Sequence, residues 1–208
     1  DLAVPGVAAA QVVANRGLAG IDGMVSTAVG VALTTRGATY AVLGDLTFLH
    51  DGNGLLAGPA EPTPDLTVVV VNDDGGGIFT TLEHGAPERA ADFERVFGTP
   101  TATDLGALCQ AHGIRHEVVA TSADLTDAVA QPHHGIRVVE VRVDRATHRA
   151  AHTDLRPLAA AALTAVLVPI ATTAHSPSVS DDEPSSPEQA IVLEDPTLSR
   201  AIGAVLTS

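Results

Sequence analysis

Two Gly-rich turns carry side chains that can bind a cation. One is Gly44–Leu46, which presents the carboxylate of Asp45, and the other is Asn72–Phe79, which presents an amide at Asn72 and a carboxylate at Asp73. Such oxygens are the ligands that a hard divalent cation takes in proteins, and the backbone N–H groups of a helix start can hold a phosphate. The two turns therefore predict cation and phosphate chemistry, although Asp-Gly and Asn-Asp pairs also occur in ordinary turns.

The elements around these turns predict an α/β fold. Strand-like and helix-like segments alternate, which indicates a parallel sheet with helices on both faces. The carboxyl ends of parallel strands lie at one edge of the sheet, where ligands bind, so the two turns are expected to meet there. We expect strands at 11–14, 39–43, 66–71, 115–119 and 136–143, and helices at 22–36, 46–56, 104–112, 122–131 and 145–167, with Ser122 as the cap of the helix at 122–131. The polar segment Phe79–Gly98 is expected to be irregular, with a helical turn.

Composition excludes several classes of function. The formal charge is −14 and all eleven basic residues are Arg, so a Walker lysine and a lysine Schiff base are excluded. Acidity and an aromatic content of 2% argue against nucleic-acid binding, and no apolar run predicts membrane insertion. The single Cys109 predicts a reducing, cytoplasmic location, and its place on an apolar helix stripe predicts that it belongs to the core. His148 and His152 have the spacing of a zinc pair but lack a third ligand, so we expect solvated histidines.

The chain divides into a folded part and a tail. Residues 1–170 are predicted to form one domain, and composition changes after that point. Residues 171–190 contain five Ser, three Pro and four acidic residues, with no Lys or Arg. That composition is typical of disorder, so we expect an acidic disordered tail at 171–208, whose end, Ile191–Leu206, is compatible with a short terminal helix.

Three motifs in this order and spacing resemble one enzyme family. They are Asn15–Gly23, Gly44–Asp51 and Asn72–Phe79, with 26 residues between Leu46 and Asp73. The pattern resembles the thiamine-diphosphate enzymes and, within them, the 2-succinyl-5-enolpyruvyl-6-hydroxy-3-cyclohexene-1-carboxylate synthase branch. The resemblance covers about residues 11–150 and implies the diphosphate domain of the thiamine-diphosphate-binding fold.

The resemblance implies a Mg²⁺ site that holds thiamine diphosphate. Asp45 and Asp73 would bind the metal through their side chains, and Gly75 would bind it through its main-chain carbonyl. The family usually has Asn at the position of Asp73, so Asn72 stays open as an alternative ligand.

The resemblance also implies roles along the cofactor and the substrate. Ile21 would press under the cofactor, while Phe79 and Leu82 would form the apolar wall near the reacting carbon. Arg16 would bind a substrate carboxylate, for which a bidentate guanidinium is suited. The remaining residues expected at the cofactor are Asp22, Gly23, Ser26, Gly44, Leu46, Asn72 and Ile78.

The implied activity is decarboxylation of 2-oxoglutarate and addition of the succinyl unit to isochorismate, in menaquinone biosynthesis, by a homo-oligomer such as a homodimer. Family members also need an N-terminal pyrimidine domain, whose glutamate activates the cofactor. We find no such segment in these 208 residues, so the isolated chain is expected to be inactive. Two alternatives stay open: another thiamine-dependent lyase or decarboxylase, and a non-catalytic module left after domain loss.

Overall fold

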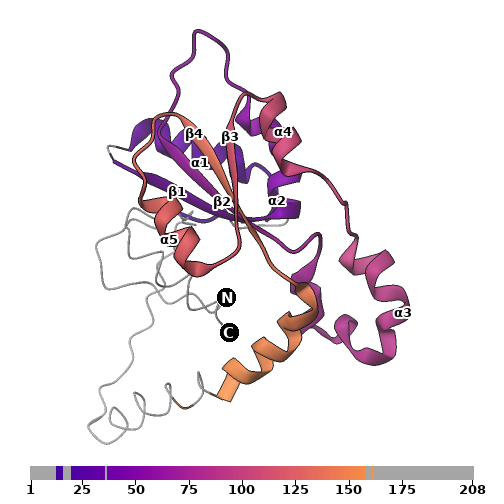
Figure 1. Cartoon of the computed structure of the whole chain (residues 1–208). Helices are drawn as coiled ribbons and strands as arrows, with labels where there is room; N and C mark the ends of the chain where they lie inside the picture. Colours follow the sequence, from indigo (N-terminus) through magenta and orange to yellow (C-terminus); the bar gives the residue numbers. More distant parts are fainter. Residues whose placement is uncertain (1–12, 16–19, 36, 158–160, 162–208) are drawn as a thin grey trace, which may run out of the picture.

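The computed structural model describes residues 13–15, 20–35, 37–157 and 161, and its centre is a parallel sheet. Four strands lie in the order β1-β2-β4-β3, all parallel (Figure 1). Their bounds are β1 Thr39–Gly44, β2 Leu66–Asn72, β3 Arg115–Val119 and β4 Ile136–Arg142. The predicted α/β fold with a parallel sheet is confirmed, and these four strands lie within a residue of their expected ends.

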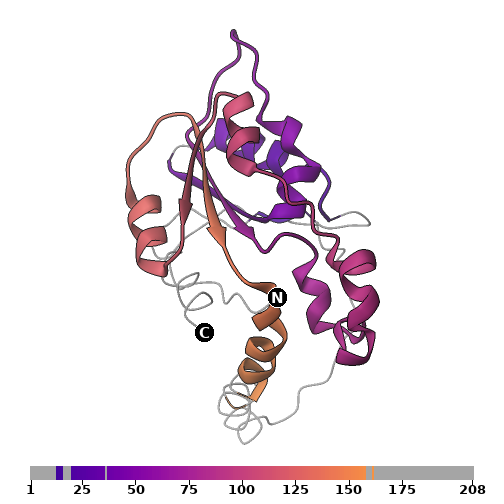
Figure 2. The same ribbon diagram turned by 45° about the vertical axis from the view of Figure 1, so that its right-hand side comes forward.

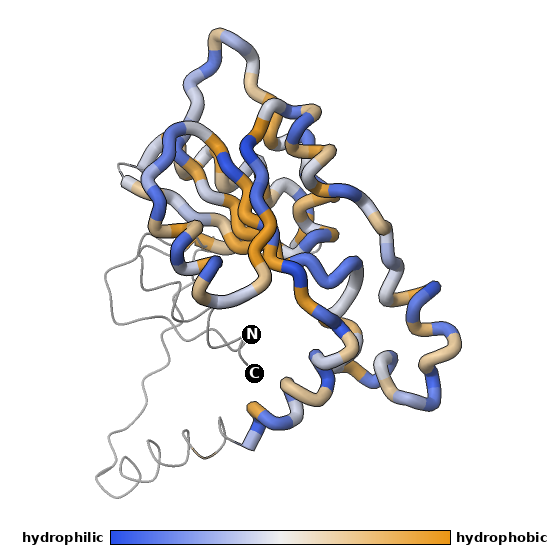
Figure 3. Tube along the Cα trace, viewed as in Figure 1, coloured by the Kyte–Doolittle hydropathy of each residue, from blue (hydrophilic) through white to orange (hydrophobic). Residues whose placement is uncertain are grey.

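Apolar strands occupy the middle of the sheet because both of its faces are covered. In β2, Val68 and Val70 belong to the core on one face, whereas Val69 belongs to the core on the other. Val138 and Val139 of β4 divide in the same way. Branched aliphatic side chains suit such a doubly buried strand, and the tube in Figure 3 is most hydrophobic along these strands.

Helices lie on both sides of the sheet, as predicted. The core on one face contains side chains of α1 (Met24–Thr34), α2 (Asp45–His50) and α4 (Leu105–Ala111). The other face is covered by α5 (Ser122–Ala130), and the rotated view in Figure 2 separates α5 from this group. Cys109 is fully buried in the α4 core, as the sequence predicted.

The segment between β2 and α4 leaves the sheet and forms a small lobe of short turns (Figure 1). Sequence predicted an irregular segment with a helical turn, and that is what the structure has. An aromatic cluster stabilises the lobe, since Phe97 stacks on His84 at 4.3 Å between ring centroids and lies 5.9 Å from Phe79. The lobe contains η2 Gly77–Thr81, η3 Glu83–Gly85, η4 Pro87–Arg89, α3 Ala90–Phe93 and η5 Glu94–Gly98.

Several boundaries differ from the sequence-based expectation. The helix predicted from Leu46 begins at Asp45, and the short turn η1 (Gly52–Leu55) replaces its second half. The cap of α5 is Thr121, whose hydroxyl accepts from the Asp124 amide at 3.1 Å, and not Ser122. Residues 13–15 are not in a strand.

The carboxyl-terminal part is described only as far as residue 161. After β4, η6 (Arg145–Thr147) leads into a helix over residues 148–157. This agrees with the first part of the helix predicted at 145–167. The predicted tail at 171–208, with its terminal helix, lies outside the described residues. In the part that is described, no helix has the length and apolar character needed to cross a membrane.

Candidate functional site

The two Gly-rich turns leave neighbouring strands at the same end of the sheet. β1 and β2 are parallel, with Gly44 paired to Val71 in the register. The carboxyl edge of the sheet therefore holds the residues at the two strand ends: Asp45 after β1, and Asn72 and Asp73 at the end of β2. We call Asn72–Gly77 the 72–77 turn.

Asp45 is a buried carboxylate with an oxygen that lacks a partner. Asp45 is 3% exposed, and its Oδ2 accepts no hydrogen bond from any residue that the structure describes. Burial, together with repulsion from the Asp73 carboxylate, raises the pKa of Asp45 to about 6, although backbone N–H groups of Leu46 and Gly75 act in the opposite direction. Asp45 and Asp73 therefore lie close enough to repel each other.

Asp73 has the same unpartnered character. Its side chain is 11% exposed, and its Oδ1 is buried without a hydrogen-bond donor in the described part of the chain. Burial raises the pKa of Asp73, which the nearby His148 and Arg145 partly offset. The backbone N–H of Gly75 lowers the pKa of both carboxylates. Asp45 and Asp73 follow neighbouring strand ends and Gly75 is two residues beyond Asp73, so the three predicted metal-binding residues lie at the same edge of the sheet.

These groups fit a divalent cation. Two buried oxygens of like charge without donors are costly, and a hard cation between them would satisfy both oxygens and remove the repulsion. No group of three or more His, Cys, Asp or Glu side chains suited to a metal occurs among the described residues. The site accordingly offers two carboxylates, with main-chain or ligand oxygens left to complete the coordination.

Asn72, the alternative ligand, is already engaged by the protein. Its amide nitrogen donates to Glu140 Oε1 at 2.9 Å, and its amide oxygen accepts from the backbone N–H of Asp74 at 2.9 Å. Because the carboxylate accepts and the N–H donates, only this orientation of the amide satisfies both neighbours. The free oxygen of the 72–77 turn thus belongs to Asp73, which favours Asp73 over Asn72 as the ligand.

Glycines in the 72–77 turn allow other groups of the protein to approach its backbone closely. A Cβ at Gly77 would lie 1.7 Å from Asp73 Oδ2, and a Cβ at Gly75 would lie 1.9 Å from the carbonyl oxygen of Gly98. Gly75 also has φ 143°, which L residues rarely adopt. The turn can therefore place Asp73 beside Gly77 only because side chains are missing there.

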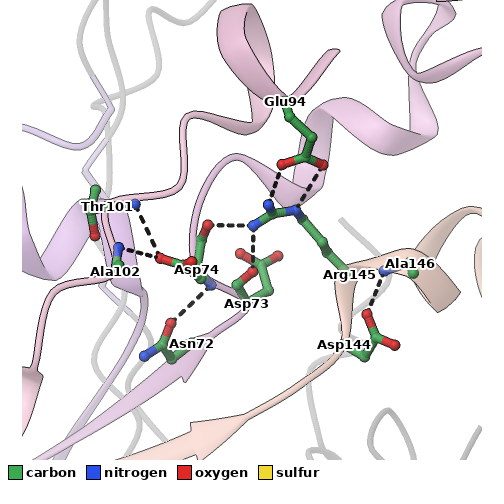
Figure 4. A network of polar contacts seen from close by, with 9 residues as sticks. All are labelled: Asn72, Asp73, Asp74, Glu94, Thr101, Ala102, Asp144, Arg145 and Ala146. Carbon is green, nitrogen blue, oxygen red and sulfur yellow. Dashed lines mark hydrogen bonds and ion pairs between the residues drawn. The ribbon is translucent and has the colours of Figure 1, made fainter. Parts of the chain in front are cut away.

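Arg145 ties the 72–77 turn to the lobe (Figure 4). Its guanidinium donates to the carbonyl oxygen of Asp73 at 2.7 Å and to that of Asp74, and it pairs with the carboxylate of Glu94. The side chain of Asp74 accepts from the backbone N–H groups of Thr101 and Ala102 at 3.1 and 2.9 Å. The backbone of the turn is thus held on the lobe side by charge-assisted hydrogen bonds.

An open cavity of about 670 Å³ lies between the turn, the lobe and the segment after β4. Two guanidinium groups line it, but both are engaged by the protein itself. Arg145 binds the turn, and Arg149 donates to the carbonyl oxygens of Thr80 and Leu82 at 2.7 and 3.0 Å.

The predicted diphosphate contacts at the start of α1 already have protein partners. Asp22 Oδ1 lies 3.1 Å from His50 Nδ1, and both side chains are about half exposed. The amide and hydroxyl of Ser26 donate to the carboxylate of Asp51 at 2.7 and 3.1 Å. Gly23 precedes the helix with φ 67°. His50 and Asp51 have a structural role that sequence did not assign: they join α2 to the start of α1.

The predicted apolar and substrate-side residues are exposed. Ile21, Phe79 and Leu82 are between a third and a half exposed, and Ile78 is 66% exposed. Phe79 and Ile78 lie in η2, directly after the 72–77 turn. Arg16 lies outside the described residues. Gly44 is the exposed last residue of β1, and Leu46 is half-buried in α2.

Sequence reasoning missed three polar residues near the site. Glu140 was part of a predicted strand, Arg145 was the start of a predicted helix, and His148 was expected to be solvated. Instead, His148 Nδ1 lies 3.5 Å from Asp73 Oδ2. Only Glu140 left a signal, because a carboxylate inside an apolar strand is rare unless it is paired.

Comparisons with known proteins point to the same family as the sequence motifs. The family model described as "Thiamine pyrophosphate enzyme, C-terminal TPP binding domain" matches residues 6–141. Curated relatives named 2-succinyl-5-enolpyruvyl-6-hydroxy-3-cyclohexene-1-carboxylate synthase include that of Saccharopolyspora erythraea, 58% identical over 72% of this chain and 27% of the relative. Those of Rhodococcus erythropolis and Paenarthrobacter aurescens are 57% and 51% identical, over 71% and 76% of this chain and 28% of each relative.

The chain thus spans just over a quarter of the length of these relatives. The family model covers well over half of the chain and includes both Gly-rich turns. The chain therefore belongs to the family of C-terminal TPP-binding domains of thiamine pyrophosphate enzymes, and the relatives that it resembles within this family are synthases of the branch indicated by its motifs.

Proposed function

We propose that Asp45 and Asp73, with the main-chain carbonyl of Gly75, bind Mg²⁺, which in turn holds the diphosphate of thiamine diphosphate. The observation that carries the proposal is the pair of buried, unpartnered carboxylate oxygens at adjacent strand ends. The backbone N–H of Gly75 lowers the pKa of both carboxylates. A cation bridging protein carboxylates and phosphate oxygens is the usual way for Mg²⁺ to be bound beside a phosphate.

The remaining roles extend the site along the cofactor. Gly44, Leu46 and Ile78 are proposed to contact the cofactor, and Asp22, Gly23 and Ser26 to contact the diphosphate once their present partners give way. Ile21, Phe79 and Leu82 are exposed apolar side chains, and we propose that they bind the reacting part of the cofactor and substrate and exclude water. Arg16 is proposed to bind a substrate carboxylate.

For the whole protein, we propose a transferase that decarboxylates 2-oxoglutarate and adds the succinyl unit to isochorismate in menaquinone biosynthesis. The names of the relatives support this reaction. When bound, the cofactor supplies the electron sink for the carbanion. The described residues supply the diphosphate half of the site, so we expect turnover only with a protein part that holds the aminopyrimidine. A homodimer and a cytoplasmic location remain predictions.

Cation binding tests the proposed site directly. We expect Asp45→Asn to weaken Mg²⁺ binding in the presence of thiamine diphosphate, as measured by calorimetry. Because Asp45 is a proposed ligand, the loss should be no smaller than the ~10–100-fold that follows loss of a partner of a metal ligand. Asp65→Asn is the matched control, because Asp65 precedes the opposite end of β2 and accepts from the Gly135 amide at 2.7 Å. Equal Mg²⁺ affinity for Asp45→Asn and Asp65→Asn would contradict the proposed site.

A further inference from the structure

Glu140 is a buried carboxylate that the proposed function does not use. It lies near the carboxyl end of β4, is 1% exposed, and accepts from Asn72 Nδ2 at 2.9 Å and Arg142 Nε at 2.8 Å. Its other oxygen lies 2.9 Å from His116 Nε2. Burial raises the pKa of Glu140, but the hydrogen bonds from Arg142 and Asn72 outweigh burial and hold this pKa below its ordinary value.

Stability alone does not explain an ionised carboxylate in this strand. Its neighbours in β4 are Val139 and Val141, both fully buried or nearly so. Replacing a buried ionic group by an apolar side chain of similar volume is often neutral or stabilising. The role of Glu140 therefore lies in the groups that it holds in place.

What Glu140 holds is the amide of Asn72. Because the carboxylate can only accept, it fixes the amide nitrogen of Asn72 toward β4 and turns the amide oxygen toward the Asp74 backbone N–H, 2.9 Å away. Asp74 has φ 55°, a left-handed conformation that Asp adopts with local hydrogen-bond support. The contact with Asn72 supplies that support at the residue between Asp73 and Gly75.

We propose that Glu140 is a positioning residue for the cation site: it orients Asn72, and through Asn72 it fixes the backbone of Asp74, so that Asp73 and Gly75 face Asp45. The proposal rests on the proposed function, since it takes Asp73 and Gly75 as ligands. It assigns to Glu140 the task of an outer partner of a metal ligand, a class of residue whose loss typically lowers metal affinity about 10–100-fold.

The test compares Glu140→Leu with Glu140→Gln in the full 208-residue chain. Leu removes every acceptor, whereas Gln keeps one oxygen for Asn72. The matched control is Arg137→Met, because Arg137 is also buried in β4, at its other end, where it donates to Thr67 Oγ1 at 3.0 Å. Far-ultraviolet circular dichroism on heating confirms that each variant is folded. The Arg142 side chain is 67% exposed, so the Leu variant leaves its guanidinium in contact with water and not buried without a partner.

Two measurements are made on each variant: the affinity for Mn²⁺ in the presence of thiamine diphosphate, by calorimetry, and amide hydrogen exchange at Asp74, by NMR. We expect Glu140→Leu to bind Mn²⁺ about 10–100-fold more weakly and to exchange the Asp74 amide about tenfold faster, because local opening becomes easier. In Glu140→Gln, the Mn²⁺ affinity and the Asp74 exchange rate should both stay within about threefold of the unchanged protein, because Gln keeps a neutral hydrogen bond to Asn72. Arg137→Met should not differ from the unchanged protein on either.

The two readouts separate failure of this inference from failure of the proposed function. A folded Glu140→Leu variant with unchanged Asp74 exchange and unchanged Mn²⁺ affinity would overturn the role of Glu140, as would a loss shared equally by Arg137→Met. If Asp74 exchange rises in Glu140→Leu while Asp45→Asn leaves Mn²⁺ binding intact, the proposed cation site is wrong and Glu140 positions the turn for another purpose, which also overturns this inference as stated.

Discussion

Two carboxylate centres lie near the carboxyl edge of the same sheet, and they differ in how their charges are satisfied. Glu140 accepts from Asn72 and Arg142 and lies beside His116, and its pKa lies below the ordinary value. Asp45 and Asp73 each keep a buried oxygen without a donor in the described structure, and their pKa values are raised. Burial is similar at Glu140 and Asp45, so the difference lies in the partners.

The comparison distinguishes a carboxylate whose partners all come from the protein from two carboxylates for which we propose a bound ligand. Natural proteins satisfy nearly all buried polar groups, so each exception asks for an explanation. At Asp45 and Asp73 the explanation that we propose is a cation, because a cation removes the repulsion between two like charges. At Glu140 the protein itself supplies the donors, and the centre stabilises the geometry of its neighbour.

Removing the arginine that holds the 72–77 turn should have the largest effect. Arg145→Met deletes the hydrogen bonds to the carbonyl oxygens of Asp73 and Asp74 and the ion pair with Glu94. We expect the free energy of unfolding to fall by about 1.5–3 kcal/mol, the range for hydrogen bonds to charged groups, as measured by urea denaturation. Arg95→Met is the control, since Arg95 is 80% exposed and 3.9 Å from Asp92; an equal loss in both variants would contradict the assigned role of Arg145.

Crowding Asp73 should weaken the cation site without changing its ligands. A Cβ in Gly77→Ala would lie 1.7 Å from Asp73 Oδ2, so the carboxylate must swing away. We expect Mg²⁺ affinity in the presence of thiamine diphosphate to drop about 10–100-fold, the range for disturbed metal surroundings. The control is Gly30→Ala on α1, where an added Cβ has no atom within 4 Å, so this variant should bind Mg²⁺ normally. Normal Mg²⁺ affinity in Gly77→Ala as well would contradict the proposed role of Asp73.

Removing one of the two repelling charges should stabilise the protein when no cation is present. The pKa of Asp45 is raised to about 6, so folding favours its protonated form, and the protein loses this stability as pH rises from about 4 through 6. Asp45→Asn escapes that loss. Its free energy of unfolding, compared with the unchanged protein, should gain of order 1–2 kcal/mol between pH 4 and pH 7. The measurement is urea denaturation without divalent cations. If the difference in free energy of unfolding between the variant and the unchanged protein stays constant from pH 4 to pH 7, the pKa of Asp45 is not raised by folding.

A helix cap far from both centres should affect stability alone. The hydroxyl of Thr121 accepts from the Asp124 amide at 3.1 Å, so Thr121→Ala should lower the free energy of unfolding by about 1 kcal/mol, the usual cost of a lost cap. Ser122→Ala is the control and should change it little. Mg²⁺ affinity should be unchanged in both variants, and a loss in Thr121→Ala would mean that general stability, not local geometry, governs cation binding.

The fold could be predicted from sequence because its signals are local. The run Leu66–Val71 became the strand β2 with nearly the expected end, since branched aliphatic residues suit a doubly buried strand. The segment Arg115–Val119 became the edge strand β3 with the expected ends. The cap of α5 was misplaced by one residue, because Thr121 and Ser122 are both good caps and only the backbone decides between them.

The site was predictable only in part because its partners are distant in sequence. Asp45 and Asp73 stood out through their turns, but the choice between Asn72 and Asp73 depends on Glu140, 68 residues further along the chain. Arg145 reaches the turn across 71 and 72 residues. Such contacts are set by strand order, with β4 placed beside β2, and no local pattern reports them.

The most direct test of the cation site is a crystal structure of the chain with Mn²⁺ and thiamine diphosphate, with the metal located by its anomalous scattering. We expect the metal between Asp45 Oδ2 and Asp73 Oδ1, close to the ~2.0–2.1 Å distances of a Mg²⁺ site, with the Gly75 carbonyl as a further ligand and Asn72 still bound to Glu140. A metal coordinated by Asn72, or one that leaves Asp45 without a ligand role, would contradict the account.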